Sequence, residues 1–191
     1  MNMSGSKFNP SAVILLSIVV LVSIFRVAAP YSDNFKDIAN FSAVGAIALF
    51  GGAYFNSSAK AFGFPLLVLL ISDIFIAQTS GFGFFYPGWY WTYIAFIAMV
   101  FASKLLLNKV NVQNLVLSTI VIVLIHWIVS DISAMYVPGL YPPTLAGFGA
   151  CLIAAIPFEL KFLYGTVIYG TVMFGVMATY PSLSFKKSVK A

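Results

Sequence analysis

Long apolar stretches, separated by short polar segments, make up most of this chain. A membrane-crossing α-helix needs about 20 predominantly apolar residues, and six of the stretches approach that length. We predict spans at about 11–28, 41–57, 62–78, 89–107, 113–131 and 162–180. The pattern therefore predicts an all-α, polytopic membrane protein whose single domain, 1–191, is a bundle of six transmembrane helices.

A seventh apolar stretch, 144–158, is shorter and is bracketed by Pro142, Pro143 and Pro157. If this stretch crosses the membrane, the chain ends on the outer side; if it does not, the chain ends in the cytoplasm. The distribution of charge can decide between the two, because short cytoplasmic loops are enriched in Lys and Arg. Six spans that start in the cytoplasm place seven of the ten basic residues there, namely Lys7, Lys60, Lys104, Lys109, Lys186, Lys187 and Lys190. A complete crossing by 144–158 would leave five on each side. We therefore predict a short outer-side or re-entrant helix at 144–158, with both termini in the cytoplasm.

The composition supports a membrane protein rather than a soluble domain. Hydrophobic residues make up 61% of the chain and charged residues 8%, whereas a soluble domain has about 25% charged residues. Six spans and their loops use nearly all 191 residues, so a separate catalytic domain is not expected. The basic residues are scattered and form no stripe, which argues against a nucleic-acid partner. The lipid bilayer is the expected surrounding.

Polar and ionisable residues within the predicted spans gather near their outer ends. With the start inside, the third span carries Asp73 and Gln78 toward the outer surface, and the fifth carries His126 and Asp131 to the same side. Ionisable residues at membrane depth are costly and usually face an interior or a cavity. The distribution predicts a cup that opens outward and not a continuous ion channel. Candidate substrate-binding residues are Asp73, Gln78, Trp89, Tyr93, His126, Trp127, Asp131 and Tyr164.

These candidates also have structural interpretations. Trp and Tyr at the start of the fourth span are equally typical of the aromatic belt at the membrane interface. Asp73 can serve an internal pair, and a single histidine such as His126 is more often part of a satisfied bundle interior than a ligand contact. Trp127 and Asp131 are four residues apart and share a helix face, so an aromatic wall and a carboxylate could meet one ligand.

Small residues are dense in the second span, where Ala48 and Gly52 form a small-xxx-small pair. Such pairs let a neighbouring helix backbone approach closely in lipid. Packing within the bundle is the first interpretation of this surface. Docking of a separate membrane partner on Ala48 and Gly52 is the second.

Common catalytic signatures are missing from the sequence. It contains no HExxH, GxSxG, P-loop or GxGxxG motif, so neither an enzyme nor a self-powered ATPase is expected. His126 is the only histidine and Cys151 the only cysteine. Too few ligands exist for a metal site, and no cofactor is predicted.

Three stretches resemble a known family: NFSAVGAIALFGGAYF at Asn40–Phe55, the Ser72-Asp73 pair, and YPPTLAGFGACLIAAIPF at Tyr141–Phe158. They look like a bacterial integral-membrane family of unknown function (DUF6580), which is similar to the S components of energy-coupling-factor (ECF) transporters. S components are six-helix proteins that capture vitamins and related nutrients. They hand the cargo to a transmembrane coupling protein with two ATPases.

The resemblance and the one-sided polarity imply a substrate-binding, S-component-like subunit in the bacterial cytoplasmic membrane. Its ligand would be a small organic nutrient bound in an outward-facing pocket. Its partners would be a transmembrane coupling protein and ATPases, or another membrane complex. The alternative is a structural or accessory subunit of a larger membrane assembly.

Overall fold

The computed structural model describes residues 43–55, 57–80 and 83–179, together with positions 17, 20, 21, 24 and 28. These residues form helices and connecting loops, and no β-strand occurs among them. The all-α prediction is thereby confirmed for this part of the chain. The predicted first span, 11–28, lies mostly outside the described residues, as do the carboxy-terminal lysines.

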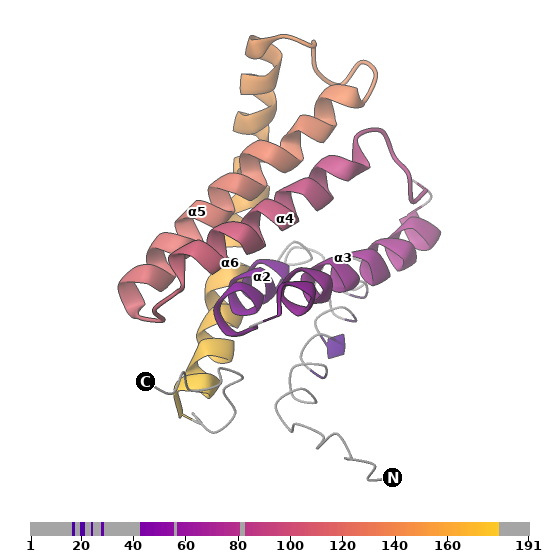
Figure 1. Ribbon diagram of the computed structural model, residues 1–191. Helices are drawn as coiled ribbons and strands as arrows, with labels where there is room; N and C mark the ends of the chain where they lie inside the picture. Colours follow the sequence, from indigo (N-terminus) through magenta and orange to yellow (C-terminus); the bar gives the residue numbers. More distant parts are fainter. Residues whose placement is uncertain are drawn as a thin grey trace.

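Five α-helices and one 3₁₀-helix follow one another along the described chain (Figure 1). They are α2 (Val44–Tyr54), α3 (Ser58–Ser80), α4 (Trp89–Leu106), α5 (Val112–Ser130), η3 (Asp131–Tyr136) and α6 (Leu145–Thr179). Helices α3 to α6 run in alternating directions, because short connections bring each helix back beside the one before it. The hairpin of α5, η3 and α6 extends beyond the α3–α4 connection (Figure 1).

Four helices are long and apolar enough to cross a membrane. They comprise Ser58–Gln78 of α3, Trp89–Leu106 of α4, Val112–Tyr136 of α5 with η3, and Leu145–Thr179 of α6. The predicted spans 62–78, 89–107 and 113–131 coincide with α3, α4 and α5 to within a few residues. These lengths and compositions identify the chain as an integral membrane protein.

Helix α2 is the centre of the bundle, although it is shorter than a span. Its 11 residues extend over about 16 Å, roughly half of the bilayer core, whereas the prediction has a longer helix at 41–57. Nine of the 11 are buried. The helix is apolar on every side, as expected for an element that other helices surround. It packs against α3, α4, α5 and α6.

The small residues of α2 lie against neighbouring helices of the same chain. Ala48 is 0% exposed. A Cβ atom added to Gly52 would lie 2.5 Å from Cβ of Ser103 and 2.8 Å from the backbone nitrogen of Lys104, both in α4. Packing within the bundle, the first interpretation of the Ala48 and Gly52 surface, therefore describes the structure. Helices of the same chain cover this surface, so it does not offer a docking site for a separate partner.

Helix α6 differs from the prediction of two separate elements at 144–158 and 162–180. The structure has one continuous helix of 35 residues, about 52 Å long, which exceeds the roughly 30 Å of a bilayer core. Thr144 caps its start by accepting a hydrogen bond from the Gly147 amide at 3.1 Å. Pro157 lies inside the helix and does not end it.

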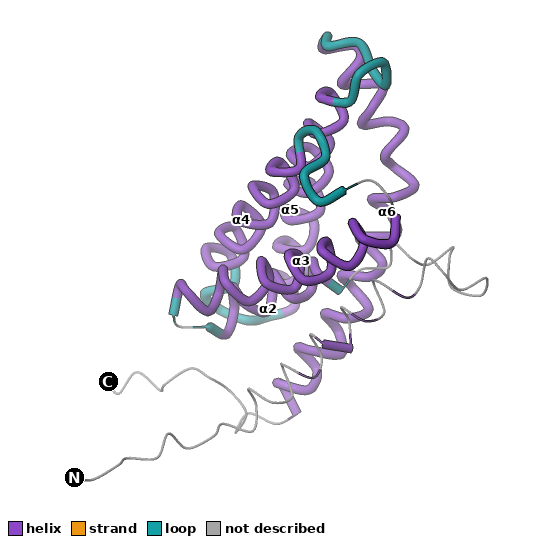
Figure 2. The backbone as a smooth tube through the Cα atoms, turned by 90° about the vertical axis from the view of Figure 1, so that its right-hand side faces the viewer, coloured by secondary structure: helices purple, strands orange, loops and turns teal. Residues whose placement is uncertain are grey.

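Pro157 provides a physical reason for the shape of α6. Proline donates no backbone hydrogen bond and clashes with the carbonyl four residues earlier, so an interior proline bends a helix that other contacts hold together. Figure 2 shows α6 changing direction along its length. The prolines around 144–158 predict helix ends, which is correct for Pro142 and Pro143 but not for Pro157.

We predict that Gly52→Val destabilises the protein by about 1–3 kcal/mol, because a side chain at this position overpacks the α2–α4 contact. The free energy of unfolding in mild detergent measures the effect. Gly63→Val in α3 is the matched control, since a Cβ there meets nothing within 4 Å. Equal stability of the two variants would contradict the close α2–α4 packing.

Candidate functional site

The strongest polar contact between helices joins α5 to α6. Nδ1 of His126 lies 2.8 Å from Oε1 and 3.1 Å from Oε2 of Glu159. A carboxylate only accepts hydrogen bonds, so the ring nitrogen donates. Glu159 is 8% exposed, and a carboxylate at that depth in a membrane protein requires a partner.

Aromatic rings surround the His126–Glu159 pair. The imidazole of His126 stacks on Phe162 of α6, with 4.1 Å between ring centroids and 13° between planes. Phe96 of α4 approaches the same imidazole edge-on, at 5.7 Å. An apolar surrounding strengthens a hydrogen bond and raises the cost of leaving either group unpaired. The pair is therefore fixed by packing from α4 and α6.

A second polar contact joins α3 to α4 at a similar depth. The Tyr93 hydroxyl donates to Oδ2 of Asp73 at 3.1 Å. Phe96, which contacts His126, follows Tyr93 by three residues, or about 5 Å along the helix axis. The two pairs thus form one layer across four helices. We call Asp73, Tyr93, His126, Glu159 and the neighbouring Asp131 the polar layer.

Asp131 and Trp127 both face α6, as their shared helix face predicts. The Asp131 backbone carbonyl accepts a weak hydrogen bond from Sγ of Cys151 at 3.9 Å. Oδ2 of the Asp131 side chain is buried and has no hydrogen-bond partner in the described part of the chain. Nε1 of Trp127 donates to the Leu152 carbonyl at 3.0 Å. The Trp127 indole N–H is thus engaged in helix packing, while one carboxylate oxygen of Asp131 is not engaged.

The other candidate residues lie around the polar layer or away from it. The Trp89 ring meets the Tyr93 ring at right angles, with 5.4 Å between centroids. Gln78 is exposed near the end of α3. Tyr164 is 53% exposed on α6. The structure therefore brings Trp89 next to the layer, and leaves Gln78 and Tyr164 at the surface.

The two ends of the bundle differ in charge. The three described acidic residues, Asp73, Asp131 and Glu159, belong to the polar layer, and we call this the acidic end. Lys60, Lys104 and Lys109 lie at the other end, which we call the lysine end. There the Lys104 ammonium donates to the Ser58 hydroxyl at 2.9 Å, which joins α4 to the start of α3. Lys161 of α6, two residues after Glu159, is the one described basic residue outside the lysine end.

With this geometry established, comparison with known proteins identifies the family. The profile of a family of unknown function (DUF6580) matches residues 6–188. The chain belongs to the DUF6580 family. No curated protein and no solved structure matches it. The family resemblance at Asn40–Phe55 and Tyr141–Phe158 is thereby confirmed for DUF6580.

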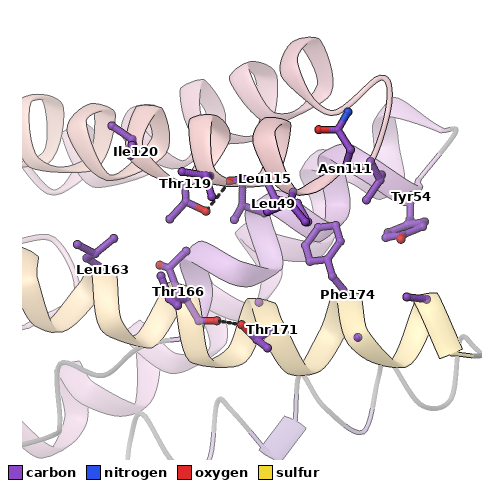
Figure 3. Close-up of a pocket in the computed structure, with 17 residues that line it drawn as sticks. Leu49, Tyr54, Asn111, Leu115, Thr119, Ile120, Leu163, Thr166, Thr171 and Phe174 are labelled. Carbon is purple, nitrogen blue, oxygen red and sulfur yellow. Dashed lines mark hydrogen bonds between the residues drawn. The ribbon is translucent and has the colours of Figure 1, made fainter.

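This DUF6580 protein also has a cavity toward the lysine end, whose lining on α6 begins at Leu163, about one helical turn after Glu159. It measures about 720 Å³ and lies between α5 and α6, with α2 behind it (Figure 3). We call it the α5–α6 crevice. Its walls are mostly apolar and include Leu49, Leu115, Ile120, Leu163 and Phe174. None of the eight candidate substrate-binding residues lines it.

Sequence reasoning missed the α5–α6 crevice and the central role of Glu159. Apolar positions on α5 and α6 look alike whether they face lipid, a neighbour or a cavity, so no sequence signal marks the crevice. A signal for Glu159 exists, since it is the only glutamate in the chain and lies two residues after Pro157. Among the described residues, no group of three metal-ligating side chains comes together.

We predict that Tyr93→Phe lowers the free energy of unfolding of this DUF6580 protein by about 0.6 kcal/mol, and by no more than about 1.7 kcal/mol. These are the average and maximum contributions of hydrogen bonds between helices in a membrane. The measurement is the free energy of unfolding in detergent. Tyr169→Phe in α6 serves as control, since that hydroxyl makes no comparable bond in the described structure. A Tyr93→Phe effect no larger than the control would show that the hydroxyl contributes nothing to α3–α4 packing.

Proposed function

We propose that this protein is the substrate-binding subunit of an uptake transporter and that it binds a small organic nutrient at its acidic end. The observation that carries the proposal is the polar layer. It contains three carboxyl groups and the single histidine, held in separate pairs or contacts toward one end of mostly apolar helices. Ionisable groups at membrane depth commonly mark substrate or ion pathways.

Asp131 is the group best suited to contact a ligand. Asp73 and Glu159 accept hydrogen bonds from Tyr93 and His126. Asp131 instead keeps a buried carboxylate oxygen without a described partner. Buried polar atoms are nearly always satisfied, so an unsatisfied one suggests a missing ligand, ion or water. A ligand with an amine or hydroxyl donor would supply the hydrogen bond.

The remaining features of the proposal follow from the topology and the resemblance. Lysine-rich loops favour the cytoplasm, so the lysine end and both termini would face it and the acidic end would open outward. Like an S component of an ECF transporter, the protein would work in the bacterial cytoplasmic membrane with a coupling protein and ATPases. It would carry out no chemical reaction on its substrate.

The alternative, an accessory subunit of a larger complex, would need another docking surface. Ala48 and Gly52 are covered by helices of the same chain. The exposed apolar side chains of α3 to α6 face outward from the bundle, where lipid is sufficient to cover them. No particular surface therefore favours a protein partner over the bilayer.

Native mass spectrometry of the gently purified protein tests the proposal. We expect the wild type to carry a small organic molecule and Asp131→Asn to retain at least about tenfold less, because hydrogen bonds to charged groups contribute about 1.5–3 kcal/mol. Gln113→Ala, an exposed position at the lysine end, is the control and should match the wild type. A wild type that carries no such molecule, or an Asp131→Asn variant that retains it fully, would remove Asp131 and the polar layer from a binding role.

A further inference from the structure

The α5–α6 crevice lies where the two helices separate toward the lysine end. Among the described residues, the hydrogen bonds that join α5 and η3 to α6 all lie at the acidic end, through His126, Trp127 and the carbonyl of Asp131. None of these extends to the crevice, which is lined from residue 110 to 120 on one side and from 163 to 178 on the other. In this part of the hairpin, the side chains of α5 and α6 therefore leave the space between the two helices unfilled.

The chemistry of the walls fits a hydrocarbon chain. Two of the wall hydroxyls are satisfied within their own helices, since Thr119 donates to the Leu115 carbonyl at 2.8 Å and Thr171 to the Val167 carbonyl at 2.7 Å (Figure 3). The Thr166 hydroxyl is buried against Gly45 of α2 and has no hydrogen-bond partner among the described residues. The crevice therefore offers mainly apolar contact, with one unsatisfied hydroxyl in its wall. Apolar cavities of this kind exclude water and accept apolar ligands.

The crevice is accessible from the lipid side of the bundle. Its edges carry Val116, Ile120 and Val167, each about half exposed, at 55%, 51% and 48%. Its floor includes Gly170 and Gly175 of α6, where an added Cβ would meet nothing within 4 Å. A flexible chain from the bilayer can therefore lie directly against the α6 backbone.

The rim of the crevice carries positive charge. Val110 and Asn111 line the rim, and the exposed Lys109 directly precedes them. Lys60 and Lys104 lie at the same end, and no described acidic residue is found there. The rim also contains the start of α5, the positive end of the helix dipole. This charge is complementary to an anionic headgroup and not to a neutral one.

We propose that the α5–α6 crevice is a lipid-binding site that holds one acyl chain of an anionic phospholipid, with its phosphate near Lys109. The volume of about 720 Å³ is within the range of specific small-molecule sites. The occupant comes from the leaflet that borders the lysine end. The site is separate from the polar layer and does not require the proposed transport function.

Native mass spectrometry with added phosphatidylglycerol or phosphatidylcholine of the same acyl chains tests the lipid site. The wild type should retain one phosphatidylglycerol in preference to phosphatidylcholine. Gly170→Leu fills the crevice and should lower this retention about tenfold, since overpacking of a filled site has costs of this size. Gly149→Leu is the matched control, because Gly149 also lies in α6, with nothing within 4 Å of an added Cβ, but outside the crevice.

Lys109→Gln tests the contribution of the lipid headgroup separately from that of the acyl chain. It should reduce the preference for phosphatidylglycerol about fivefold, the value of one basic side chain near a membrane surface, while phosphatidylcholine binding stays unchanged. Equal phosphatidylglycerol retention by Gly170→Leu and Gly149→Leu would overturn the site. So would a dimer that Gly170→Leu abolishes, because a second copy of the chain would then occupy the crevice.

Discussion

The hydrogen bond between His126 and Glu159 is the interaction on which the arrangement of α5 and α6 depends. Glu159 follows Pro157 by two residues, so the bond holds α6 to α5 just where the helix bends. Trp127 and Cys151 add weaker contacts on the same side of the bend. Toward the lysine end the two helices separate around the crevice. The pair lies among Phe96 and Phe162 with its side chains only 18% and 10% exposed, so little water is available to replace a lost partner. This makes the contact selective for one helix register.

This asymmetry produces two chemically different ends in one small bundle. Helix α2 supplies the common apolar centre, and close approach at Gly52 lets α4 pack on it. The acidic end concentrates hydrogen-bonding groups, including the unsatisfied Oδ2 of Asp131, and is suited to a polar solute. The lysine end combines a positive rim with an apolar crevice and is suited to a lipid. The two proposed sites share α5 and α6 but no residue, so each can be tested separately.

The sequence predicts the helices of this protein better than it predicts their contacts. Hydropathy located α3, α4 and α5, because lipid requires long apolar helices with internally paired backbones. It overestimated α2 and divided α6 at Pro157, because a proline ends a helix or bends it depending on tertiary contacts. The clustering of Asp73, His126 and Asp131 at one end follows from helix direction alone. The sequence does not predict that Tyr93 pairs with Asp73 and Glu159 with His126, nor that a crevice forms. These contacts depend on how each helix is rotated about its axis and how far apart the helices lie, which an apolar pattern with little periodicity does not specify.

A double-mutant cycle on His126 and Glu159 tests the central interaction most directly. The free energy of unfolding in detergent would be measured for His126→Ala, Glu159→Ala, the double variant and the wild type. We expect the double variant to lose less stability than the sum of the single variants, with a coupling of about 1–3 kcal/mol. Each single change strands a buried polar group, whereas the double change removes both. Additive losses would instead mean that His126 and Glu159 contribute to the bundle independently and that their hydrogen bond does not hold α5 to α6.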